Sequence, residues 1–144
     1  GVVQLCGAEI QMTEYEFRQA VSALVLQAGI VAEAAVDMPN GSGFSPPRGL
    51  WLRLGFSGAQ GLFAGFGDMP LTRRTGLVTV QCFAPAAEYT GALEEAAGAL
   101  VRLLEWHFAP GFELQAAETA DVGLSDDGLW WQKNVRVPFL IKAV

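Results

Sequence analysis

The sequence is poor in the side chains from which most metal and catalytic sites are built. It has one histidine, His107, and two cysteines, Cys6 and Cys82, among 144 residues. A zinc site normally needs several such ligands close together, and these cysteines form neither a CxxC motif nor a metal-binding spacing. We therefore expect no zinc site. Cys82 alternates in phase with Val78 and Val80, which predicts a buried thiol and fits a reducing compartment.

Charge is also scarce and mostly acidic. Charged residues make up 17% of the chain and hydrophobic residues 51%, and nine basic against fifteen acidic side chains give a net charge of −6. Typical soluble domains contain about 25% charged residues, so we expect some apolar surface to meet another copy of the chain. Arg73 and Arg74 are the only adjacent basic pair. The sequence therefore lacks the basic stripe of a nucleic-acid-binding protein.

Long apolar runs and a basic leader are missing as well. A membrane-spanning helix needs roughly 18–20 apolar residues, whereas the longest uncharged stretches, 19–32 and 54–67, are interrupted by Gln, Ser or Gly. The first residues, GVVQLCGAEIQ, lack the basic start of a signal peptide. We expect no membrane segment, no export signal and a single domain spanning residues 1–144.

Hydrophobic periodicity predicts an α+β fold. Thr13 and Glu16 form a capping box at the start of a helix that ends near Gly29, and a second helix runs from Thr90 to about Phe108. Strands are expected near residues 50–56, 62–66, 76–85, 112–117 and 129–144. The order α-β-β-β-α-β-β predicts a mostly antiparallel sheet with both helices packed on one face. Pro138 cannot donate to a neighbouring strand, which predicts an edge or a bulge there.

No motif points to catalysis. GFSGA at 55–59 misses the GxSxG nucleophile motif because Ala59 replaces the last glycine, and GFSGAQG lacks the Lys-Ser/Thr of a phosphate loop, so we expect a hairpin or loop. Adjacent carboxylates at 94–95 and 126–127 fit a solvated helix rim and a turn. His107 falls near the predicted end of the second helix, which favours a structural imidazole. A small-molecule-binding or hydrolytic domain using His107 and a carboxylate is the alternative from another class.

The tryptophans indicate what lies on the second face of the sheet. Trp51 alternates with the leucines at 50, 52 and 54, and Trp130 and Trp131 must point to opposite faces. Trp51 and one of the adjacent pair therefore leave the helix-covered side, either toward another subunit or under the segment 58–74. We expect Trp106, near the end of the second helix, to be partly in the core.

Three segments then occur in an order shared with one family. They are PNGSGFSPPRGLWLRL after the first predicted helix, RRTGLVTVQCFAP, and WWQKNVRVPFL. Together they resemble the phage tail terminator-like family, the group related to minor tail protein U of lambda-type siphophages. The residues that carry the resemblance are Asn40, Phe44, Pro46, Pro47, Gly49, Trp51, Leu52, Arg53, Arg74, Gly76, Phe83, Pro85, Val135, Val137, Pro138 and Phe139.

The resemblance implies a structural virion protein without catalysis or cofactor. Such a protein closes into a ring, usually a hexamer, at the head-proximal end of the tail tube. There it stops polymerisation of the tube protein and offers a surface to head-completion or connector proteins, while DNA passes through the lumen without specific binding. It would be assembled in the bacterial cytoplasm. A head–tail connector or tail-completion protein of the same particle is the alternative.

The expected contact residues come from two stretches and one tryptophan. The loop around Arg73 and Arg74 offers two guanidinium groups able to bind carboxylates of a neighbour, although a simply solvated loop would have the same composition. The candidates are Trp51, Arg53, Met69, Leu71, Arg73, Arg74 and Trp130.

Overall fold

The computed structural model describes residues 11–39, 41, 43–63, 72–88 and 90–143. Its two helices are α1 (Glu14–Gln27) and α2 (Gly91–Leu104), and a short 3-10 helix covers Glu33–Ala35. The strands are β1 (Val36–Asp37), β2 (Trp51–Phe63), β3 (Thr72–Pro85), β4 (Phe108–Ala109), β5 (Phe112–Leu114), β6 (Glu118–Leu124) and β7 (Trp130–Ala143). The predicted positions of Met69 and Leu71 lie outside the described residues.

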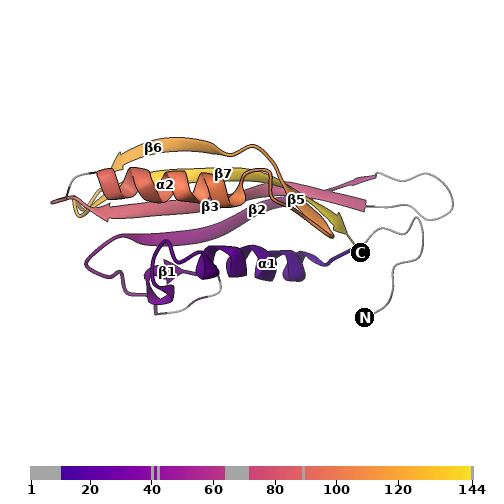
Figure 1. Cartoon of the computed structure of the whole chain (residues 1–144), viewed down its shortest axis with the longest axis horizontal. Helices are drawn as coiled ribbons and strands as arrows, with labels where there is room; N and C mark the ends of the chain where they lie inside the picture. Colours follow the sequence, from indigo (N-terminus) through magenta and orange to yellow (C-terminus); the bar gives the residue numbers. More distant parts are fainter. Residues whose placement is uncertain (1–10, 40, 42, 64–71, 89, 144) are drawn as a thin grey trace.

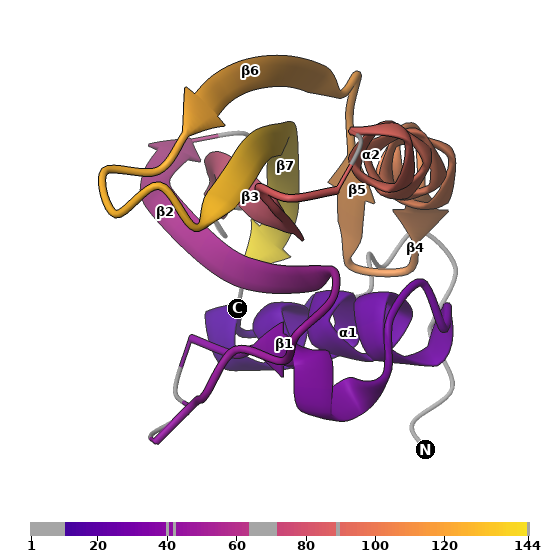
Figure 2. The ribbon, with the colours of Figure 1, turned by 90° about the vertical axis from the view of Figure 1, so that its left-hand side faces the viewer.

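These strands form one sheet in the order β1-β2-β3-β7-β5-β4, with β6 also paired to β7 (Figure 1). All pairs are antiparallel except β1 with β2. The predicted α+β class and the order α-β-β-β-α-β-β are confirmed, and β4 and β6 are additional strands after α2. Figure 2 shows both helices on one side of the sheet, where they share a single hydrophobic core with it.

The sequence explains why α1 forms and how it packs. The predicted capping box is present: the Glu16 amide donates to Thr13 Oγ1 at 3.1 Å, and the Thr13 amide donates to Glu16 Oε1 at 3.0 Å. Phe17, Val21 and Val25 then recur on one face and are buried. The Phe17 ring lies 4.5 Å from that of Phe139 and 5.2 Å from that of Phe112, so α1 is anchored to β7 and β5.

The second helix is shorter than predicted. It ends at Leu104 rather than near Phe108, and Thr90 makes no side-chain capping bond. Glu105 follows with a non-helical ψ of 131°, which ends the helix, and Trp106 then has a left-handed φ of 56°. His107 is therefore not helical; its ring stacks on Phe112, 5.8 Å between centroids. The prediction that Trp106 is partly in the core is wrong, because its side chain is 57% exposed.

The glycine-rich stretch GFSGAQG is not a loop. It lies inside β2, so the predicted strands at 50–56 and 62–66 are not separate, and residues 58–63 do not belong to an excursion. Twelve residue pairs join β2 to β3, with a register shift between Gly58 and Gln60. Gly58 has φ of +90°, and a Cβ there would lie 2.8 Å from the Cα of Gly76. Close strand approach at this irregularity thus requires glycine.

Pro138 is neither at an edge nor in a bulge, contrary to prediction. It faces Leu77 in the regular β3–β7 ladder, and β7 is bordered on its other side by β6 and then β5. Its carbonyl accepts from the Gln115 amide at 2.9 Å on that other side. The backbone nitrogen and carbonyl of one strand residue point to the same side of the strand. The Pro138 nitrogen, which carries no hydrogen to donate, therefore faces the gap between β5 and β6. No ladder hydrogen bond to β3 is lost.

Candidate functional surfaces

A second, small aromatic cluster lies on the face of the sheet that the helices leave uncovered. Trp51 from β2 stacks on Phe83 from β3, with ring centroids 4.1 Å apart and planes within 12°. Trp130 meets the Trp51 ring edge-on at 5.7 Å, and Phe44 lies 5.2 Å from it. Trp131 packs against the main core instead, which confirms that Trp130 and Trp131 point to opposite faces.

Trp51 is covered by its own chain. It is only 3% exposed and packs with Ala35, Val31 and Phe44, all from the connection between α1 and β2. The cover is therefore this connection and not the segment 58–74. Trp51 does not offer its ring to a neighbouring subunit in this structure, and its Nε1 is buried without a hydrogen-bond partner.

Arg53 forms the exposed side of this cluster. Its Cζ lies 5.1 Å from the centroid of the Trp51 ring and 5.4 Å from that of Phe83, and its Nε donates to Asp37 Oδ2 at 2.9 Å. The Arg53 side chain is 48% exposed. It borders a shallow hollow of about 260 Å³ that also contains Ser57, Thr79 and Gln81. The guanidinium is thus fixed in place yet open to solvent.

The two other predicted arginines lie far from this hollow. Arg73 and Arg74 stand at the start of β3, opposite Lys142 and Ile141 of β7, and both are partly exposed. Eight residues of β3 separate Arg73 from Gln81, the partner of Arg53. At about 3.3 Å per residue this is roughly 26 Å, so the structure does not bring the predicted contact residues into one site.

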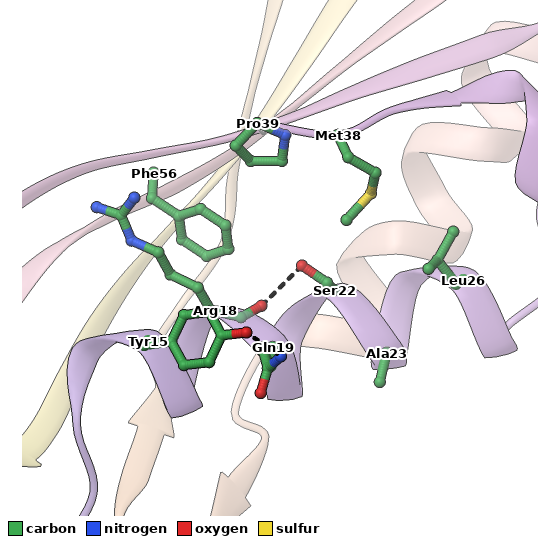
Figure 3. A pocket seen from close by; sticks show the side chains of 9 residues that line it. All are labelled: Tyr15, Arg18, Gln19, Ser22, Ala23, Leu26, Met38, Pro39 and Phe56. Carbon is green, nitrogen blue, oxygen red and sulfur yellow. Dashed lines mark hydrogen bonds between the residues drawn. The ribbon is translucent and has the colours of Figure 1, made fainter. Parts of the chain in front are cut away.

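The largely apolar groove between α1 and β2 was not predicted from the sequence (Figure 3). It has a volume of about 380 Å³. Its lining residues are Tyr15, Arg18, Gln19, Ser22, Ala23, Leu26, Met38, Pro39 and Phe56. The Arg18 Cζ lies 5.3 Å from the centroid of the Phe56 ring. A signal was present, because positions 15, 19, 22 and 26 form a second stripe at helical spacing along α1.

Two large aromatic side chains protrude near the other end of the strand order. Trp106 and Phe108 are 57% and 62% exposed, and their ring centroids are 6.4 Å apart. They border a hollow of about 410 Å³ with Glu113, Gln115 and Pro138. Exposed apolar side chains also occur on and after β6, at Val122, Leu124 and Leu129.

The titratable groups do not converge on a catalytic arrangement in the described part of the chain. Lys133 bonds to Glu94 on α2 and to Asp121 on β6, and these hydrogen bonds, the Glu94 bond first, raise its pKa. Burial raises the pKa of the Cys82 thiol to about 12. Within residues 11–143 as described, no three His, Cys, Asp or Glu side chains are grouped to hold a metal ion. Among the same residues, no helix is long and apolar enough to cross a membrane.

Comparison with known proteins gives no family. No protein-family model matches the chain, and no curated protein sequence matches it significantly.

Proposed function

We propose that the protein is a structural virion protein that caps the head-proximal end of a phage tail tube. In this role it forms a ring, with six copies as the expected number, stops polymerisation of the tube protein and offers the surface on which the head is joined. Catalysis and cofactors have no part in the role, and DNA passes through the lumen without specific binding. The site of action is the virion, after assembly in the bacterial cytoplasm.

The observation that carries the proposal is the ordered set of motifs from Asn40 to Phe139. Its members come from distant parts of the chain, yet Phe44, Arg53 and Phe83 all lie against Trp51 on one face of the sheet. Four of the motif residues therefore form one cluster in this chain, which supports the proposal.

The surface supports self-association as well. A ring needs two different patches per subunit that meet head-to-tail. The groove lies beside β2, and Trp106 and Phe108 lie just before and on β4, so the two surfaces are near opposite ends of the order β1-β2-β3-β7-β5-β4.

The test is deletion of the gene from the phage or phage-derived particle that encodes it, followed by electron microscopy of the tails. We expect overlong or headless tails, and restoration of normal tails when the protein is supplied from a plasmid. Tails of normal length joined to heads would contradict the proposal.

The alternative within the same particle is a head–tail connector or tail-completion protein. Deletion of such a protein leaves tail length unchanged while preventing head joining. Antibody labelling of purified tails separates the two roles further, since a terminator is present on tails that have never met a head.

A further inference from the structure

The protruding aromatic pair is held in a costly conformation. Trp106 has φ of 56°, the one positive φ among described non-glycine residues, and more than half of its side chain faces solvent. Such a backbone conformation is unfavourable for a bulky residue, and an exposed indole gains little packing to compensate for it. Phe108 lies beside it, equally exposed, on the short strand β4. These two rings form a projecting apolar surface that nothing in the described chain covers.

The groove at α1 offers room for apolar side chains and carries a basic residue at its border. Its volume of about 380 Å³ lies within the range of pockets that bind ligand-sized apolar groups. Arg18 borders the groove, and Glu113 borders the projecting pair. Neither Arg18 nor Glu113 makes an ion pair with another described residue. An acidic rim beside the projection and a basic rim beside the groove are the arrangement expected of two surfaces that meet.

We infer that Trp106 and Phe108 of one copy occupy the groove of the next copy, where Glu113 of the first pairs with Arg18 of the second. Two different surfaces of the same chain are used, so the contact is heterologous and repeats around a ring. This inference deepens the proposed function and rests on it for the ring. The occupant of the groove is thus a second copy of this chain.

Disulfide trapping tests the contact even where association is weak. In a Cys6→Ser background, a protein with Arg18→Cys is mixed with one carrying Glu113→Cys under mild oxidation, and the mixed disulfide is followed on non-reducing gels. Cys82 is fully buried and stays out of the reaction. The matched control replaces Arg18→Cys by Arg48→Cys, at an exposed arginine away from the groove. We expect the 18–113 pair to form at least about tenfold faster than the 48–113 pair, because docking raises the effective thiol concentration.

A second substitution tests which copy supplies the aromatic pair and which copy supplies the groove. Phe108→Asp in the protein that carries Glu113→Cys removes part of the projection and should reduce trapping to the control rate. The same Phe108→Asp in the protein that carries Arg18→Cys leaves the groove intact and should leave trapping unchanged. Circular dichroism of each variant confirms that it is folded. Equal rates for the 18–113 and 48–113 pairs, or equal effects of Phe108→Asp in either protein, would overturn the inference.

These outcomes are separable from those of the proposed function. Preferential trapping together with normal tails after gene deletion would retain the contact and reject the tail role. Overlong tails after deletion without preferential trapping would retain the role and reject this contact. Loss of binding to tube ends by Arg18→Glu, with no preferential trapping, would assign the groove to the tube protein and also overturn the inference.

Discussion

The guanidinium of Arg53 lies over the indole ring of Trp51, 5.1 Å from its centroid, while its Nε is bonded to Asp37. The ion pair is half exposed, so it contributes at most about 1 kcal/mol, and stacking on an aromatic ring contributes a similar amount. The larger contribution comes from the ring itself, which is almost completely buried on the face opposite the helices. Arg53 covers this ring and keeps its terminal nitrogens toward solvent.

Trp51→Ala should lower the free energy of unfolding by about 3–5 kcal/mol, the usual cost of deleting a large buried aromatic side chain. Trp51→Phe should cost clearly less, because the lost Nε1 donor has no partner in the folded protein. Urea unfolding followed by far-UV circular dichroism measures both. Equal losses for the two variants would contradict the conclusion that the buried aromatic ring supplies most of the stability.

Gly58→Ala should destabilise the sheet by roughly 1–2 kcal/mol for the positive φ, with a further cost from crowding against Gly76. Gly49→Ala is the matched control, since its Cβ would meet nothing within 4 Å and its φ is not in the left-handed region. The control should change stability little. A Gly58 variant as stable as the control would mean that the β2–β3 irregularity is absent.

Thr13→Ala should cost about 1 kcal/mol through loss of the α1 cap. Glu16 adds a pH dependence, because its hydrogen bonds to Thr13 lower the pKa of its carboxyl. A lowered pKa gives stability that is present above the ordinary value of 4.5 and is lost as the pH falls through the folded-state value. Wild type should therefore exceed Glu16→Gln in stability at pH 7, and the difference should shrink as the pH falls below 4.5. A difference that does not depend on pH would contradict this origin.

Cys82 should make the folded protein less stable as the pH rises in the alkaline range, whereas Glu16 makes it less stable as the pH falls. Burial raises its pKa from 9.0 to about 12, so the thiol ionises in the unfolded chain before it does so in the folded one. Stability from this group is complete below pH 9 and falls, by up to about 1.4 kcal/mol per pH unit, as the pH rises toward 12. Urea unfolding at pH 8, 9 and 10 should show a steeper decline for wild type than for Cys82→Ala. Identical slopes would argue against a buried thiol.

Replacing Arg73 and Arg74 together by Glu should abolish tail termination while the chain remains folded, if these side chains bind carboxylates of a neighbour. The control is Arg48→Glu with Arg102→Glu, which changes the charge equally at two exposed positions. Complementation of the gene deletion, with tail lengths measured by electron microscopy, compares the two double variants. Normal termination by the Arg73 and Arg74 variant would remove them from the contact.

Capping motifs and hydrophobic periodicity predicted the helices and strands for which the local sequence preference matches the conformation that tertiary packing requires. The capping box placed the start of α1, and strict alternation placed Leu52 and Leu54 in the core and Trp51 on the other face. The same rules failed for GFSGAQG, because its glycines are typical of a turn and only pairing with β3 keeps them extended. They also failed just after α2, where Trp106 has a left-handed φ that glycine usually adopts.

The candidate surfaces were less predictable because they depend on what lies beside each strand. Alternation showed that Trp51 leaves the helix face, but only the fold shows that Val31, Ala35 and Phe44 cover it. The groove joins Arg18 on α1 to Phe56 on β2 and to Met38 between them, and no spacing within one element reveals such a junction. The low content of charged residues indicated self-association, but it did not indicate which surface takes part.

The central position of β7 has a consequence for the order of synthesis. This strand, Trp130–Ala143, is the last one along the described chain, yet β3, β5 and β6 all pair with it. While the chain is being translated, α1, α2 and the β2–β3 ribbon emerge from the ribosome before the strand that completes their core. Their apolar faces must wait for residues 130–143, so final folding follows the release of this segment from the ribosomal tunnel.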